Sequence, residues 1–147
     1  MNLNHPILRN SIGMLLGIIV GGIVNMTLIM NSSKLIPPPI GTNLKTEAGL
    51  IAAMPLMQPI HFLMPFLAHA IGTLVGAFIV TAIAISRQKT LALIIGLQFF
   101  IGGAMMVYKL PSPIWFNLTD LILAYFPFAL LGYWLCKKIN SSFINVK

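Results

Sequence analysis

The sequence predicts an all-α membrane protein, a bundle of four transmembrane helices with a short helix in an outer loop. Of its 147 residues, 58% are hydrophobic and only 7% are charged, and the mean hydropathy is +0.94. A soluble domain of this size needs more charged surface than that. Four apolar segments also approach the roughly 20 residues that cross a hydrocarbon core. The third observation is that polar or proline-containing stretches separate these segments.

The four predicted helices cover residues 11–30, 60–85, 90–107 and 118–136. The first segment is longer than a signal-peptide core, and no small-residue cleavage site follows it, so we expect a retained helix. The loops between the helices are too short for a soluble appendage. Residues 1–147 are therefore expected to form a single transmembrane domain.

The net charge of +7 indicates a membrane setting more than a nucleic-acid partner, because the nine lysines and arginines are scattered beside the apolar segments. Membrane lipids are the expected partners, with other membrane subunits or further copies of the chain as alternatives. One side of the predicted bundle carries Arg9, Arg87, Lys89, Lys137, Lys138 and Lys147, and the other carries Lys34, Lys45 and Lys109. This bias predicts that both termini are cytoplasmic.

Two sets of small residues recur at intervals of four, and such residues let helix backbones approach closely in membranes. They are Gly13, Gly17 and Gly21 in the first helix and Ala68, Gly72 and Gly76 in the second. We expect the two sets to pack against each other. The pattern leaves open whether the first set instead faces another subunit.

His69 is the strongest candidate for an intramembrane polar site, because an imidazole within an apolar helix must be neutral or paired. Gln98 is its expected partner, since the two lie at similar depths in antiparallel helices. Asn25 is a further polar candidate, expected near the outer end of the first helix. A structural hydrogen bond is one interpretation of this group, and a ligand or proton-relay site is the other.

Three polar residues are candidates at the outer face: His61, Asp120 and Glu47. Thr46 and Glu47 fit the start of the short loop helix, as its N-cap and as a charge favoured by the helix dipole. Asn117 and Asp120 have the spacing of an N-cap and its N3 partner at the start of the fourth helix. These residues could also form a small polar vestibule with the intramembrane group.

No metal site, cofactor or catalytic residue is predicted. Eight residues separate His61 from His69, which is about 12 Å of helical rise and too far for both to bind one ion. His5 is predicted on the opposite side of the membrane. Cys136 is the only cysteine, which excludes an internal disulfide.

Three stretches resemble an uncharacterised family of small four-helix bacterial integral membrane proteins. They are IPPP at residues 36–39, HFLMPFLAHAIGTLVGAF at 61–78 and PSPIWFNLTDLILAYFPFALLG at 111–132. The resemblance implies a bacterial membrane setting, which we take to be the inner membrane. It supplies no activity and no functional residue.

Three functions follow as hypotheses. The first is an accessory or interaction subunit of a membrane complex, supported by the shortage of ionisable groups. The second is a small transporter or channel that uses His69 and Gln98. The third is a membrane enzyme acting on a lipid or quinone through His61 and Asp120.

Overall fold

The computed structural model describes residues 5–144, with side chains up to residue 141. Within that range the chain is helical and contains no strand. The elements follow in the order α1 (Pro6–Leu35), α2 (Glu47–Ala53), η1 (Met54–Leu56), η2 (Pro59–Phe62), α3 (Leu63–Ile83), α4 (Gln88–Lys109), α5 (Ile114–Leu123) and α6 (Phe126–Ile144).

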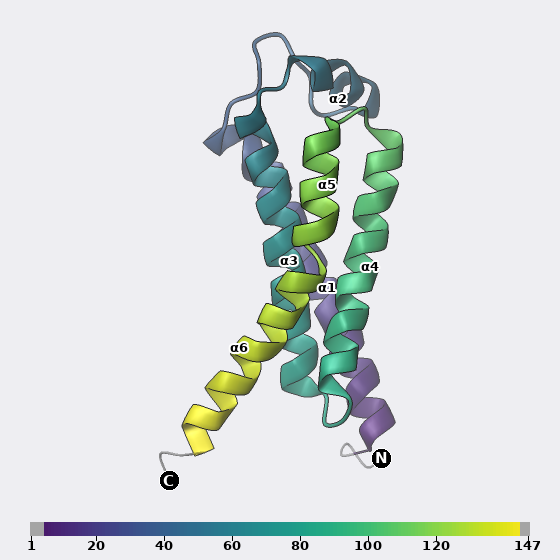
Figure 1. Cartoon of the computed structure of the whole chain (residues 1–147), viewed down its shortest axis with the longest axis vertical. Helices are drawn as coiled ribbons and strands as arrows, with labels where there is room; N and C mark the ends of the chain where they lie inside the picture. Colours follow the sequence, from purple (N-terminus) through teal and green to yellow (C-terminus); the bar gives the residue numbers. More distant parts are fainter. Residues whose placement is uncertain (1–4, 145–147) are drawn as a thin grey trace.

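Four stretches are long and apolar enough to cross a membrane, as expected of a small four-helix integral membrane protein. They are Pro6–Leu35, Pro59–Ile83, Gln88–Lys109 and Ile114–Ser141. Figure 1 shows that α1 starts and α6 ends at the same end of the bundle, while α2 lies at the opposite end. The predicted fold class and the predicted short loop helix are therefore confirmed.

Helix α3 occupies the centre of the bundle, and α1, α4 and α6 all pack on it. Small residues allow α1 to approach closely: a methyl group added to Gly17 would lie 2.7 Å from the Gly76 carbonyl oxygen. One added to Gly21 would lie 2.7 Å from the Gly72 carbonyl oxygen. The two backbones are thus in direct contact, with no room for a side chain at these positions.

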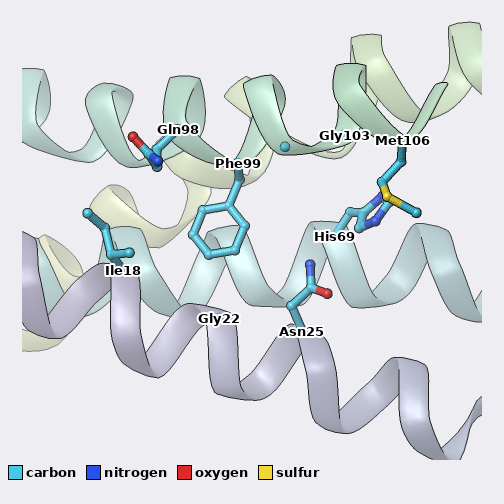
Figure 2. A pocket seen from close by; sticks show the side chains of 9 residues that line it. Ile18, Gly22, Asn25, His69, Gln98, Phe99, Gly103 and Met106 are labelled. Carbon is cyan, nitrogen blue, oxygen red and sulfur yellow. The ribbon is translucent and has the colours of Figure 1, made fainter. Parts of the chain in front are cut away.

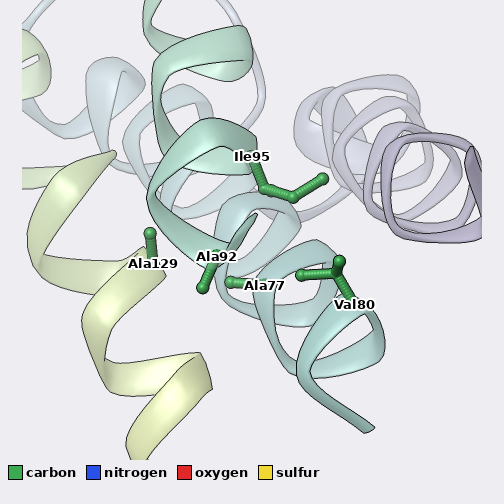
Figure 3. Close-up of a cluster of buried hydrophobic side chains, with 5 residues drawn as sticks. All are labelled: Ala77, Val80, Ala92, Ile95 and Ala129. Atoms are coloured by element: carbon green, nitrogen blue, oxygen red, sulfur yellow. The ribbon is translucent and has the colours of Figure 1, made fainter. Parts of the chain in front are cut away.

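A second contact layer lies where α3, α4 and α6 meet (Figure 3). Its buried members are Ala77, Val80, Ala92, Ile95 and Ala129. Three of these five side chains are single methyl groups, so the helices can pack with little space between them. This apolar layer lies closer than His69 to the end of the bundle that holds the start of α1.

The short helix α2 begins as its sequence predicts. The Thr46 hydroxyl oxygen accepts a 3.1 Å hydrogen bond from the Gly49 amide, and Glu47 occupies the first turn. An N-cap of this kind satisfies an amide that the helix leaves unpaired. Both residues are exposed, so their position is explained by helix-end electrostatics.

The start of the fourth span differs from its prediction. Helix α5 begins at Ile114, and the expected N-cap, Asn117, lies inside it with its amide bonded to the Pro113 carbonyl at 3.1 Å. Proline is tolerated at a helix start because its missing N–H would have no helical partner there. The capping assignment of Asn117 and Asp120 is therefore wrong, and Asp120 lies six residues inside the helix.

Candidate functional site

Asp120 is a buried carboxylate within a membrane span, not a residue of the outer face. Its position six residues beyond Ile114 places it about 9 Å along α5, and its side chain is only 2% exposed. An unpaired charge in such a place is costly. The structure must therefore supply partners for it.

The first partner is His69 of α3. Its Nδ1 atom lies 2.9 Å from each carboxylate oxygen of Asp120. The imidazole is 18% exposed, so it stands between the buried carboxylate and the space beside α3. This contact joins the second span of the bundle to the fourth.

The second partner is Tyr125, which is fully buried. Its hydroxyl donates a 2.8 Å hydrogen bond to Asp120 Oδ2 and lies 3.0 Å from His69 Nδ1. The two rings also stack, with centroids 5.7 Å apart. Asp120, His69 and Tyr125 form one cluster, which we call the triad.

A break in the fourth span makes the triad possible. Residues Ala124 and Tyr125 form a turn between α5 and α6, and Pro127 lacks the amide that would bond to Leu123 in a continuous helix. In an ideal helix, positions 120 and 125 point about 140° apart. The break turns Tyr125 back toward Asp120.

Helix α4 makes room for the triad with a glycine. A side chain at Gly103 would collide with the Tyr125 hydroxyl. The adjacent Gly102 is different, because nothing lies within 4 Å of a methyl group added there. Gly103 is thus the position of α4 that lies against the triad.

A groove of about 320 Å³ runs beside the triad, which is within the size range of small-molecule sites. Helices α1 and α4 form its walls, and His69 reaches it from α3 (Figure 2). Its lining residues are Ile18, Gly22, Asn25, His69, Gln98, Phe99, Gly102, Gly103 and Met106. All of them lie inside the membrane spans.

The expected pairing of His69 with Gln98 is wrong. Both residues line the groove, but Figure 2 shows them on opposite sides of Phe99. Gln98 precedes Gly103 by five positions, or about 7.5 Å of helical rise. The imidazole instead contacts the carboxylate of Asp120, which the sequence spacing had placed at a helix end.

Asn25 lies deeper than expected because α1 continues to Leu35, ten residues beyond it. It is about 15 Å from that end of the helix. Its Cβ lies close to Gly72, where an added methyl group would be 2.8 Å away. Figure 2 shows Asn25, His69 and Met106 together at one end of the groove.

His61 is separate from this group and bonds to loop backbone. Its Nδ1 accepts a 2.9 Å hydrogen bond from the Gln58 amide, which leaves Nε2–H to donate to the Pro37 carbonyl at 3.1 Å. This bond links the loop that contains Pro37 to η2. His61 and Asp120 therefore belong to different networks, and the expected vestibule does not include His61.

Tyr125 is the member of the site that the sequence interpretation missed. A signal was present, because Pro127 predicts a break whose neighbouring side chains change direction.

No group of three or more histidine, cysteine or acidic residues within 5–144 is placed to hold a metal ion.

Comparison with protein-family models, curated proteins and solved structures finds no match to this chain.

Proposed function

We propose that this chain is a small membrane protein that binds a molecule dissolved in the bilayer, with His69 as the group that hydrogen-bonds to it. One observation supports this most strongly. A buried carboxylate contacts Nδ1 of the imidazole and the ring lines the groove, which leaves Nε2 as the ring nitrogen for bonding to a molecule there. Ionisable groups inside membranes are costly, and they commonly mark functional sites.

The position of the groove supports entry from the bilayer. Its walls belong to α1 and α4, which each pack on α3 but make few contacts with each other. Gly22 and Gly102 stand on opposite walls, and a methyl group added to either would meet nothing within 4 Å. The groove therefore has open space between two helices that face lipid.

A lipid-soluble photoreactive probe, trifluoromethyl-phenyldiazirine, tests this function in nanodiscs. We expect mass spectrometry to find the label concentrated on Phe99, Met106 and His69. In the double variant Gly22→Leu/Gly102→Leu the new side chains fill the groove, and labelling there should be lost. The glycine positions are open, so this variant should still fold.

Ile19→Leu is the matched control, because Ile19 is 46% exposed on α1 and does not line the groove. Its labelling pattern should equal that of the unchanged protein. Uniform labelling of all lipid-facing helices, insensitive to the glycine substitutions, would overturn the proposed function.

An accessory-subunit role is the second candidate, and the exposed apolar face of α1 favours it. This face presents Leu15 at 60%, Ile23 at 59% and Met30 at 72% exposure. Stoichiometric purification with another membrane subunit, unaffected by His69→Phe, would support this role over ligand binding. Transport is the weaker candidate, since Phe99 separates His69 from Gln98 along the groove.

We also propose the bacterial inner membrane as the location, with both termini cytoplasmic. The bundle end that holds the start of α1 carries Arg9, Arg87 in the α3–α4 turn and Lys89 in the first turn of α4. Lysine and arginine are retained on the cytoplasmic side during insertion. Reporter fusions to the C-terminus and to the loop containing Lys45 test this orientation, and a periplasmic C-terminus would contradict it.

A further inference from the structure

The chemistry of the groove restricts the charge of its ligand. None of the lining residues is lysine, arginine, aspartate or glutamate. An anion would therefore find no fixed cation. A cation would need the carboxylate of Asp120, but this is 2% exposed and already hydrogen-bonded to His69 and Tyr125. A neutral ligand fits these surroundings.

The triad also determines which hydrogen-bonding role Nε2 plays. A net charge buried in the membrane is costly, so the His69–Asp120 pair is most stable when it is neutral overall. Two neutral forms leave no buried hydrogen unpaired while Tyr125 donates to Asp120: an imidazolium beside a carboxylate, or an imidazole beside a carboxylic acid whose proton is donated to Nδ1. In both forms Nε2 carries a hydrogen, so it donates to a ligand acceptor.

A second donor lies at the same end of the groove. Figure 2 shows the side chain of Asn25, which belongs to the α1 wall of the groove, near the ring of His69. An asparagine amide offers N–H groups in addition to its oxygen, and no hydrogen bond within residues 5–141 occupies them. Two donors from two helices suit a ligand with carbonyl oxygens.

The depth of His69 in the membrane distinguishes between the kinds of molecule that could supply the carbonyl group. His69 follows Pro59 by ten residues, which places it about 15 Å below the outer end of this span. Its partner Asp120 lies about 9 Å along α5, so both helices place the pair inside a hydrocarbon core about 30 Å thick, below the interfacial region. Ester carbonyls of glycerolipids belong to the interfacial region, whereas a quinone is an apolar molecule whose ring carbonyls can enter the core.

We propose that the groove binds a quinone-type molecule, with a ring carbonyl oxygen accepting a hydrogen bond from His69 Nε2. This inference rests on the proposed function and adds the class of ligand. The remaining lining residues, including Phe99 and Met106, supply apolar and aromatic contact for the ring.

Calorimetric titration of the protein in nanodiscs, against empty nanodiscs, tests the inference. The probes are a short-chain ubiquinone, its analogue with both ring carbonyls replaced by methoxy groups, and dioctanoylglycerol. We expect saturable binding of the ubiquinone and several-fold weaker binding of the analogue, because an aryl ether oxygen is a weaker hydrogen-bond acceptor than a ring carbonyl. Dioctanoylglycerol should bind no better than the analogue.

Two variants test whether the preference for the ubiquinone depends on the donors at the His69 end of the groove. His69→Phe/Asp120→Leu removes the donor without leaving an unpaired carboxylate, and Asn25→Leu removes the second donor while retaining the triad. Each should reduce the preference for the ubiquinone over its methoxy analogue. Thr27→Leu is the matched control, since Thr27 is an exposed polar residue of α1 that does not line the groove, and the preference should stay unchanged.

Equal binding of the ubiquinone and its methoxy analogue would overturn the inference. So would His69-dependent binding of dioctanoylglycerol, which would assign the carbonyl to a glycerolipid. Diazirine labelling of the groove without ubiquinone binding would refute only the ligand class. Absence of both would refute the proposed function as well.

Discussion

His69 Nδ1 lies 2.9 Å from both carboxylate oxygens of Asp120, although 51 positions separate the two residues in the chain. The contact crosses from α3 to α5 within the membrane spans. It places an ionisable pair beside a groove that opens between two other helices. We expect both the stability of the bundle and its proposed binding chemistry to depend on this pair.

Removing one member of the pair should destabilise the protein strongly. Asp120→Ala leaves His69 and Tyr125 without their shared hydrogen-bond partner, and we expect a loss of about 3–5 kcal/mol in the free energy of unfolding. Titration with SDS from mixed micelles measures this loss. Thr119→Ala, at an exposed neighbouring position, is the control and should change little.

A double-mutant cycle tests whether the pair acts as a unit. His69→Phe/Asp120→Leu removes both polar groups, so its cost should be smaller than the sum of the two single substitutions. Strictly additive costs would show that the contact contributes no coupling energy.

Neighbouring glycines of α1 should respond in opposite ways to alanine. At Gly21 the new methyl group would lie 2.7 Å from the Gly72 carbonyl oxygen, and we expect about 1–3 kcal/mol of destabilisation. At Gly22 nothing lies within 4 Å, so stability should be kept or increased. Thermal unfolding in detergent compares the two variants, and equal effects would contradict the observed α1–α3 packing.

Gly103→Ala should disturb the triad, because the added methyl group would collide with the Tyr125 hydroxyl. We expect lower thermal stability and weaker ubiquinone binding. Gly102→Ala is the matched control, since its position is open. Combining Gly103→Ala with Tyr125→Phe should recover part of the stability by removing the nearest clashing atom. A Gly103→Ala protein as stable as the control would place Tyr125 elsewhere.

His61→Ala should act on the outer loop alone. It removes the 3.1 Å bond to the Pro37 carbonyl, so residues 36–45 should be cleaved faster in limited proteolysis. Ubiquinone binding should be unchanged, because His61 does not line the groove. A matching loss of binding would connect His61 to the ligand site after all.

Composition and segment lengths were enough to predict the four spans and the loop helix, because lipid imposes a strong pattern on sequence. The spacing of Gly17 and Gly21 likewise drew attention to the side of α1 that meets α3. Local patterns failed at Asp120, whose spacing from Asn117 imitates a capping motif. Its true setting depends on where Pro113 starts the helix and on a partner from a distant span.

Tyr125 was missed for a related reason. The turn at Ala124 and Tyr125 is implied by Pro127, but the direction that Tyr125 takes after the turn depends on the space left by Gly103. Such a fit arises from the packing of α4 against the broken helix. It has no signature in the spacing of either segment alone.

The most direct test of a ligand held by His69 is solid-state NMR on a protein with a single labelled histidine. His5 and His61 are replaced, His69 carries nitrogen-15, and the ring carbonyls of the short-chain ubiquinone carry carbon-13. The account predicts a protonated Nε2 whose signal shifts on ubiquinone addition and couples through space to a ring carbonyl. An unprotonated Nε2, or a signal that the ubiquinone leaves unchanged, would contradict it.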